Sequence, residues 1–177
     1  MIRKIKFLCT AIYHRLISKN KLAKLIGVNF GENCSFMTRG WGSEPYLITI
    51  GNDVETSSNV IFVTHDGGVG VLRNLYPEYA KIDLFKPIII GNNVFIGINT
   101  TILPGTKVGD NVVIGAGSLV KGELKSNSVY AGVPIRYICS IEEYALKNRE
   151  KFDNTRDLNP EAKKEYLLRK YEIAEAV

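Results

Sequence analysis

Aliphatic residues recur at every sixth position through the middle of the chain. They are Ile90, Ile96, Ile102, Val108, Ile114 and Val120, and glycine follows four of these six. The fifth place of each hexad is small or aliphatic, from Val94 to Ser118. A helical face needs apolar residues three and four apart, and a plain strand alternates every two residues before it turns. A six-residue period held over this length fits neither element.

A parallel β-helix accounts for this period. Each hexad supplies one short strand and one turn, so three hexads close a triangular coil, and the next coil stacks about 4.8 Å away. The aliphatic first position then points inward, and we expect the glycine to supply the backbone conformation of a tight corner. Residues eighteen apart should stack, as Asn93 would on Asn111. Stacked asparagine side chains can form hydrogen-bonded ladders along the coil axis.

Weaker hexads precede this block, and two segments interrupt them. The weaker hexads begin at Phe30 and Ile50. The first break lies between Phe36 and Ile50, and the second, longer break lies between Val63 and Pro87. A structureless loop of the second length inside a compact domain is usually functional. We therefore expect a mainly β domain over 27–138, with an inserted loop at 64–86.

Both ends of the chain are predicted to be helical. Apolar residues form a rough helical stripe over 2–25, so 1–26 is predicted to be an amphipathic helical segment. In the C-terminal extension, 139–177, Pro160 opens a predicted helix that runs from Glu161 to Ala176. Helices at these places would cap the coil, whose open ends expose unpaired strand edges.

The positive charge of the chain is concentrated at one end. The net charge is +5, and residues 1–31 hold seven basic side chains and no acid, which leaves −2 for the remainder. The body of the protein is therefore not a nucleic-acid-binding surface by composition. A basic amphipathic helix can bind anionic lipids, so peripheral contact with a membrane is one hypothesis for 1–26, and a simple cap on the coil is the other.

Cysteine usage and hydropathy bear on the compartment. The three cysteines, Cys9, Cys34 and Cys139, lie far apart and form no CxxC pair. This argues against a disulfide framework and a thiolate metal site, and it fits a reducing compartment. Cys34 falls on an inward position and is interpreted as a small buried hydrophobe. No apolar run approaches the roughly 20 residues that span a bilayer. We expect a cytoplasmic protein, or one peripheral at the inner membrane face.

Of the two histidines, His65 is the candidate for chemistry. It lies where a strand ends and the long loop begins, and Asp66 or a nearby backbone carbonyl could fix its tautomer. The glycines that follow suit a backbone that approaches a ligand. A lone histidine can equally be structural, which is our interpretation of His14. Gamma-class carbonic anhydrases hold zinc through three histidines on this kind of coil, so one usable histidine predicts no metal site.

Three stretches closely resemble the hexapeptide-repeat acyltransferases. They are IGNNVFIG at 90–97, ILPGTKVGDNVVIGAGSLV at 102–120 and the AGVPIR ending at 131–136. The similar branch contains maltose and galactoside O-acetyltransferases, xenobiotic acetyltransferases, and the sugar O-acetyltransferases of capsule and lipopolysaccharide synthesis. The resemblance covers roughly 27–138. It implies a left-handed coil and a homotrimer, with acetyl-CoA laid along the groove between neighbouring coils.

The same resemblance assigns roles to individual residues. His65 matches the catalytic histidine, which as a general base would take the proton of an acceptor hydroxyl while that oxygen attacks the thioester. Asp66 beside it completes the predicted catalytic pair. The positions that match acetyl-CoA contacts are Ile98, Ala116, Lys121, Gly122 and Arg136. Many relatives have Thr-Lys where this chain has Lys121-Gly122, so its lysine is displaced by one position.

The acceptor site is sought in the two breaks. Trp41 and Glu44 lie in the first break and Arg73 in the second. An aromatic face with charged groups is what a sugar-binding site uses, although Trp41 would serve equally as a packing anchor. We expect acetyl transfer to a sugar hydroxyl, on a sugar or lipid-linked sugar of capsule or lipopolysaccharide synthesis. The alternatives are an N-acetyltransferase acting on an amino-sugar nucleotide or a xenobiotic, and a non-catalytic β-helix used for assembly or binding.

Overall fold

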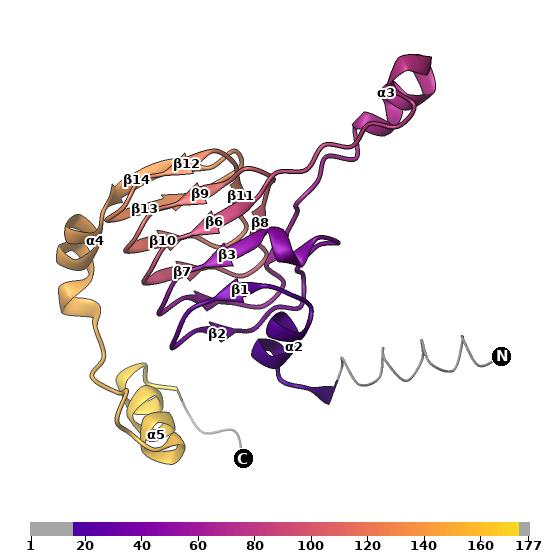
Figure 1. The fold of residues 1–177 in the computed structure, drawn as a ribbon. Helices are drawn as coiled ribbons and strands as arrows, with labels where there is room; N and C mark the ends of the chain where they lie inside the picture. Colours follow the sequence, from indigo (N-terminus) through magenta and orange to yellow (C-terminus); the bar gives the residue numbers. More distant parts are fainter. Residues whose placement is uncertain (1–15, 174–177) are drawn as a thin grey trace. The chain divides into compact units, whose positions relative to one another are not determined.

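The computed structural model describes residues 16–173, which belong to two compact units, Met1–Tyr144 and Ala145–Val177. The first unit is built from three sheets that the chain visits in turn (Figure 1). The first sheet contains β1 (Asn29–Phe30), β3 (Ile48–Ile50), β6 (Ile88–Ile90), β9 (Lys107–Val108) and β12 (Glu123–Leu124). The second contains β2 (Ser35–Phe36), β4 (Glu55–Thr56), β7 (Val94–Ile96), β10 (Val112–Ile114), β13 (Ser128–Ala131) and β14 (Arg136–Ser140). The third contains β5 (Ile61–Phe62), β8 (Thr101–Ile102) and β11 (Leu119–Val120).

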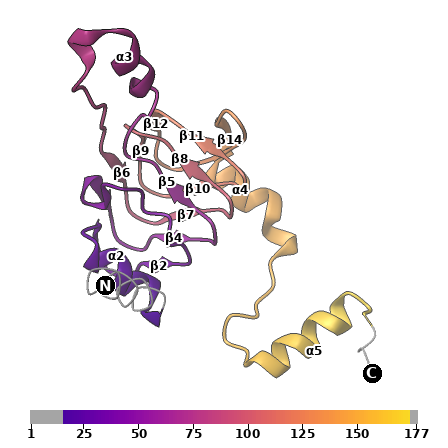
Figure 2. The same cartoon turned by 90° about the vertical axis from the view of Figure 1, so that its right-hand side faces the viewer.

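The pairing register shows a parallel β-helix. Val94 pairs with Val112 and Thr101 with Leu119, which are eighteen residues apart, as the hexad period predicts. Figure 2 shows the strands of successive coils stacked on one another. The offset shortens to sixteen residues in the last coil, where Val112 pairs with Ser128. Every neighbouring pair in these sheets is parallel except β13 with β14, which is antiparallel.

The interior of the coil is filled from two positions of each hexad. The aliphatic first positions, from Ile90 to Val120, are buried, and so are the fifth positions, from Val94 to Ser118. The predicted inward orientation is therefore confirmed. At the N-terminal end the interior is aromatic, because Trp41 stacks on Phe62 at 4.9 Å and meets Phe36 edge-on at 5.0 Å. Trp41 is only 1% exposed, so its proposed use as a sugar-binding face is wrong and it is a packing anchor.

The corners of the coil use glycine and asparagine differently from our expectation. At the corner that follows Ile90 and Val108 the residues in the left-handed region are asparagines, Asn93 (φ 52°) and Asn111 (φ 56°), whose short polar side chains tolerate it, whereas glycines such as Gly105 (φ 80°) take this conformation at other corners. Gly91 is not in that region. A Cβ built on it would lie 2.5 Å from Asp110 Oδ1 and 2.8 Å from the carbonyl carbon of Gly109. The glycine is therefore required for the close approach of the next coil, and not for its own backbone conformation.

Hydrogen-bonded ladders connect the coils along one corner. The Asn93 side-chain amide donates to Asn111 Oδ1 at 2.8 Å, and the Asn111 amide donates to Asn127 Oδ1 at the same distance. Beside this ladder, the backbone N–H of Asn92 donates to Asp110 Oδ1 at 2.6 Å. The ladder predicted from the eighteen-residue stacking is thus confirmed, and it satisfies backbone and side-chain donors that the sheets leave unpaired.

The second break projects from the coil as an arm (Figure 1). It is not structureless, because it contains the helix α3 (Val69–Leu75) and the 3-10 turn η2 (Pro77–Tyr79). The first break holds a further 3-10 turn, η1 (Pro45–Leu47). Both breaks fall at corners between sheets, so the strands on either side keep their parallel pairing.

The N-terminal end of the coil is capped by α2 (Lys19–Leu25). The Asn20 side chain donates to the Cys34 carbonyl at 2.6 Å and accepts from the Phe36 N–H at 3.0 Å, so it pairs the open edge of β2 as predicted. The helix predicted over 2–25 is interrupted at Ser18, whose hydroxyl accepts from the Lys21 N–H. Cys9 and His14 lie outside the described residues.

The C-terminal region differs from the prediction at two points. The strand β14 was not expected, and it covers the outer edge of β13 in antiparallel register. After α4 (Ile141–Asn148) and η3 (Arg149–Lys151), the helix α5 (Pro160–Lys170) begins at Asn159, whose side chain accepts from the Ala162 N–H. It ends at Lys170, short of the predicted end at Ala176. The domain boundaries at residues 26 and 138 stay predictions.

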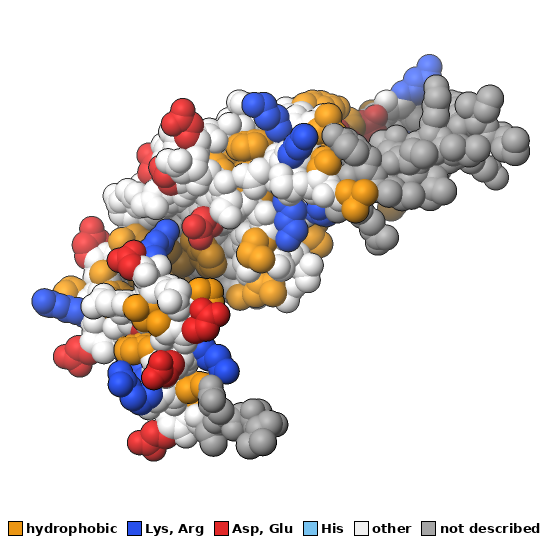
Figure 3. Space-filling view, turned by 90° about the horizontal axis from the view of Figure 1, so that it is seen from below, with side chains coloured by type: hydrophobic (Ala, Val, Ile, Leu, Met, Phe, Trp, Pro, Cys, Tyr) orange, Lys and Arg blue, Asp and Glu red, His pale blue; other side chains and the backbone are white. Residues whose placement is uncertain are grey.

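Surface charge and hydropathy complete the description. On the face shown in Figure 3, basic and acidic side chains are interspersed and hydrophobic side chains form small separate groups. Among residues 16–173, no helix has the length and apolar character needed to cross a lipid bilayer.

Substituting Gly91 by alanine should destabilise the first unit, because the added Cβ overlaps the backbone of Gly109. We expect a loss of about 1–3 kcal/mol in the free energy of unfolding, measured by urea titration. Gly70→Ala is the matched control, since a Cβ at Gly70 meets no atom within 4 Å and the helix α3 favours alanine. Equal stability of the two variants would contradict the close-approach explanation.

Candidate active site

The position of His65 is fixed by the base of the arm. The chain leaves β5 at Val63 and runs antiparallel to the returning strand, so that His65 forms a β-bridge with Phe85. The Asp66 N–H donates to the Leu84 carbonyl at 2.9 Å, and the Lys86 N–H donates to the Thr64 carbonyl at 3.0 Å. Because these bonds tie both sides of the arm together, the backbone that carries His65 is held at the corner of the coil.

The first break brings a carboxylate to this histidine. Gly42 has φ +68°, and a Cβ on it would lie 2.8 Å from the Phe62 carbonyl oxygen, so only glycine lets the loop pass this close to β5. Two residues later, Glu44 Oε2 lies 3.0 Å from Nδ1 of His65. The hydroxyl of the fully buried Thr64 donates to the same oxygen at 2.6 Å. Ser43 Oγ is 3.3 Å from Nδ1.

These contacts decide the charge state of Glu44 and the tautomer of His65. The hydrogen bond from Thr64 holds the pKa of the Glu44 carboxyl below its ordinary value, and His65 adds to this against the opposing effect of burial. An ionised carboxylate accepts only, so Nδ1 carries the proton and Nε2 carries the lone pair. Among the described residues, Nε2 has no hydrogen-bond partner. The side chain of His65 is 42% exposed, so this nitrogen is accessible to a ligand.

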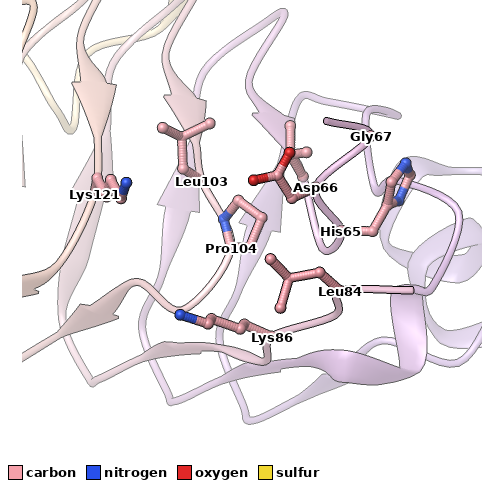
Figure 4. Close-up of a pocket in the computed structure, with 9 residues that line it drawn as sticks. His65, Asp66, Gly67, Leu84, Lys86, Leu103, Pro104 and Lys121 are labelled. Carbon is pink, nitrogen blue, oxygen red and sulfur yellow. The ribbon is translucent and has the colours of Figure 1, made fainter. Parts of the chain in front are cut away.

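Asp66 does not have the role that the sequence suggested. Its Oδ1 accepts from the N–H of Gly68 at 2.8 Å, which closes a turn at the start of the arm. Figure 4 shows its carboxylate directed toward Leu103 and Pro104, whereas the His65 imidazole points to the other side of the chain. The tautomer-fixing carboxylate is therefore Glu44, which the sequence had placed in the acceptor site.

Two cavities meet at His65. The first, of about 350 Å³, is lined by apolar residues, two lysines, His65 and one acid, Asp66. It is lined by Val63, His65, Asp66, Gly67, Leu84, Lys86, Leu103, Pro104 and Lys121. The second, also of about 350 Å³, lies between the first break and the arm. It is lined by Ser43, Glu44, His65, Asp66, Gly67, Val69, Arg73, Asp83, Leu84 and Phe85.

Two lysines give the first cavity its positive charge. The stem of Lys86 lies over Gly105, where a Cβ would be 3.0 Å from its Cδ, and this contact directs the side chain along the cavity. Lys121 follows β11 and lies across the cavity from His65, to the left in Figure 4. Within the part of the chain that the structure describes, neither ammonium group makes an ion pair. Both are therefore available to an anionic ligand.

The residues predicted to contact acetyl-CoA lie at two different corners of the coil. Lys121 and Gly122 follow β11, at the same corner as His65. Ile98 follows β7 and Ala116 follows β10, at the corner across the third sheet, where the Gly117 N–H donates to the Ile98 carbonyl. Arg136 begins β14, opposite Ala131. One chain alone does not bring Ile98 and Ala116 to His65.

Arg73 reaches the site from α3. Its Nε donates to the Ile82 carbonyl at 2.7 Å and its guanidinium pairs with Asp83, so it fastens the helix to the returning strand of the arm. It also lines the second cavity, and its predicted role in the acceptor site stays a prediction.

The remaining candidates have no part in this site. Burial raises the pKa of the Cys34 thiol, which packs against the core as predicted for a small hydrophobe. Among residues 16–173, no group of three or more histidine, cysteine and acidic side chains could hold a metal ion.

The sequence analysis missed several residues of the site, among them Ser43, Thr64, Phe85 and Lys86. Thr64 carried a signal, because it continues the inward alternation of Val60 and Phe62 and so had to be buried beside His65. Lys86 and Phe85 directly precede the point where the hexads resume, and Ser43 lies in the irregular first break. Nothing in the sequence pattern distinguished these three from other loop residues.

Comparison with known proteins supports the fold. The family described as bacterial transferase hexapeptide (six repeats) matches residues 87–122. A galactoside acetyltransferase solved in complex with coenzyme A superposes with a TM-score of 0.50 at 28% identity, over 78% of this chain and 74% of that chain.

Two relatives are similar in sequence. The protein CapG of Staphylococcus aureus is 48% identical over 170 residues, which cover 94% of this chain and 96% of CapG. A putative lipopolysaccharide biosynthesis O-acetyl transferase of Escherichia coli (strain K12), WbbJ, is 36% identical over 97 residues, which cover 51% of this chain and 49% of WbbJ. Because the match to CapG extends over nearly the whole of both chains, this protein belongs to the hexapeptide-repeat transferases, left-handed parallel β-helix enzymes, and within them to the acyltransferases.

Proposed function

We propose that this protein transfers the acetyl group of acetyl-CoA to a sugar hydroxyl, with His65 as the general base. The observation that carries the proposal is the contact of 3.0 Å between Glu44 Oε2 and Nδ1 of His65, which places the lone pair of the neutral ring on Nε2, and His65 lines both cavities. A histidine held this way accepts a proton at neutral pH without a change of tautomer.

The reaction then needs no covalent acyl-enzyme. The acceptor oxygen attacks the thioester carbonyl carbon while its proton passes to Nε2 of His65. The carbon–sulfur bond breaks, the acetyl group stays on the acceptor oxygen, and the proton moves from Nε2 to the departing thiolate of coenzyme A. Glu44 is a positioning residue that stabilises the imidazolium formed between these two proton transfers.

The two lysines of the first cavity favour the donor on that side. Coenzyme A carries several phosphate charges, and Lys86 and Lys121 are cations without an ion pair in a lining whose one acid is Asp66. The relative solved with coenzyme A supports the same donor class. In this proposal the acceptor occupies the second cavity, on the other side of the imidazole.

The separation of the predicted donor contacts supports a trimer. Ile98 and Ala116 are one coil corner away from His65 in the same chain, so they share a cleft with it only when a second copy contributes its own corner. Association around a threefold axis makes three such clefts, each from two different corners. Arg136 would meet the phosphates of coenzyme A at the outer end of the groove.

The acceptor class rests on the relatives. WbbJ is described as a lipopolysaccharide biosynthesis O-acetyl transferase, and the solved relative as a galactoside acetyltransferase. We propose a sugar of surface-polysaccharide synthesis as the acceptor, free or lipid-linked. The seven basic side chains within residues 1–31 would favour contact with the anionic lipids around a lipid-linked acceptor.

Replacement of His65 by alanine should lower the rate of acetyl transfer by about 10²–10⁴-fold, the usual contribution of a general base. The measurement is thiol release from acetyl-CoA in the presence of a sugar panel. His14→Ala, which removes the other histidine, is the control and should keep full activity. Equal turnover of His65→Ala and the unchanged protein would refute the assigned role.

Glu44→Gln should lower kcat by about 10- to 100-fold, since it removes a charge-assisted hydrogen bond to the imidazolium. Without the carboxylate the imidazolium is less stable, so the acid limb of the pH–rate profile should move to lower pH. Glu44→Asp should restore part of the rate, and Glu161→Gln in the second unit should change nothing. A purely structural role for Glu44 predicts lost stability with an unmoved pH profile, and that result would contradict the proposal.

Mixing two inactive variants should recover activity if each cleft uses two copies. In His65→Ala the Ala116 corner is intact, and in Ala116→Glu the His65 corner is intact. Co-refolded mixtures should reach about a quarter of the unchanged activity, because one cleft of each mixed trimer receives both intact corners. Mixtures that remain inactive, or light scattering that finds only single chains, would exclude the shared cleft.

A further inference from the structure

The second cavity has a lining that selects among sugars. Its carboxylates are those of Glu44 and Asp83 and its single cation is Arg73, whereas the Asp66 carboxylate points toward the first cavity. With the imidazole neutral, these charges leave the cavity with an excess of negative charge. The first cavity, with Lys86 and Lys121, has the opposite character. The imidazole of His65 therefore lies at a boundary between a basic and an acidic side.

An exposed aromatic ring forms one wall of the acidic side. The ring of Phe85 is 6.1 Å from the His65 imidazole, centroid to centroid, at an interplanar angle of 67°. Phe85 is 47% exposed although it lies at the base of the arm, where its β-bridge to His65 fixes the backbone. A rigid apolar face beside polar groups suits the C–H face of a sugar ring, whose hydroxyls then reach the surrounding acceptors.

The polar groups around Phe85 are arranged to accept hydrogen bonds. Arg73 is already engaged by the Ile82 carbonyl and Asp83, so its charge is balanced within the cavity wall. Glu44 has further carboxylate lone pairs for hydroxyl donors. An anionic sugar would instead place a carboxylate beside Glu44 and Asp83 in a partly enclosed space, where Arg73 offsets only one of these two charges, which is unfavourable.

The size of the cavity limits the ligand. About 350 Å³ is at the low end of the roughly 300–1,000 Å³ of small-molecule sites, which suits one sugar ring. We propose that the second cavity binds a single sugar ring without a carboxylate, stacked on Phe85, and that its acidic lining excludes uronic acids and other acidic sugars. This inference rests on the proposed function and specifies the acceptor class of the same site.

The test compares an acidic sugar with its uncharged counterpart. The best acceptor of a panel of neutral sugars is identified with acetyl-CoA, and a methyl uronoside and its amide are then added as competitors. The two competitors have nearly the same size and differ at one group, a charged carboxylate in one and a neutral carboxamide in the other. We expect the amide to inhibit at least about tenfold more strongly than the carboxylate. In Asp83→Asn, which leaves the Arg73 charge unbalanced, this preference should shrink or reverse, whereas the surface control Asp157→Asn should keep it.

A second measurement addresses the aromatic wall. Phe85→Leu should raise KM for the acceptor by about three- to tenfold with KM for acetyl-CoA unchanged, and Phe85→Trp should keep the acceptor KM low. Phe152→Leu, an exposed phenylalanine of the second unit, is the matched control.

The outcomes separate the two proposals. If no sugar is acetylated and no thiol is released, the proposed function fails, and this inference fails with it. If sugars are acetylated but the carboxylate competes as well as the amide, or Phe85→Leu leaves the acceptor KM unchanged, only this inference is overturned.

Discussion

The closeness of successive coils is the constraint on which the rest of the structure depends. Neighbouring strands pair through backbone hydrogen bonds, so the corners between them must also lie in contact, and at Gly91 over Gly109 no side-chain carbon fits. Residues at equivalent corner positions of successive coils consequently stack in columns along the coil axis. Val63, Leu103 and Lys121 stand on such a column, and His65 follows Val63 by two residues, which is why His65 and Lys121 line one cavity.

The coil could be predicted because every hexad needs buried aliphatic or small side chains at the same two places. Ile96 and Thr100 both point inward, and in every hexad the residue types at the first and fifth places indicate these inward positions. The roles of the corner residues were harder to predict, because glycine and asparagine stand close together in each hexad. The sequence does not say which of the two adopts positive φ and which is needed for close contact with the next coil. The strand β14 and the end of α5 at Lys170 lie outside the repeat and had no periodic signal.

Only the part of the site next to a hexad strand could be predicted from the sequence. His65 stood out because a strand ends and the period stops beside it. The contact of Glu44 with His65 joins the breaks of two different coils and depends on the passage of Gly42 across Phe62, which no local pattern contains. For the same reason Trp41, an apparent surface aromatic in an irregular segment, turned out to be the interior end of a stack of rings, and Phe85 supplies the exposed one.

The arm leaves the coil and returns to it at a single corner, closed by the bridge between His65 and Phe85. Beyond that bridge the coil resumes as though nothing had been inserted, with Glu55 opposite Phe95 and Thr56 opposite Ile96. The arm is therefore an insertion at one corner that leaves the strand pairing of the coil unchanged. A change in the length or sequence of the arm can therefore alter the lining of the second cavity while the strand pairing of the coil stays the same.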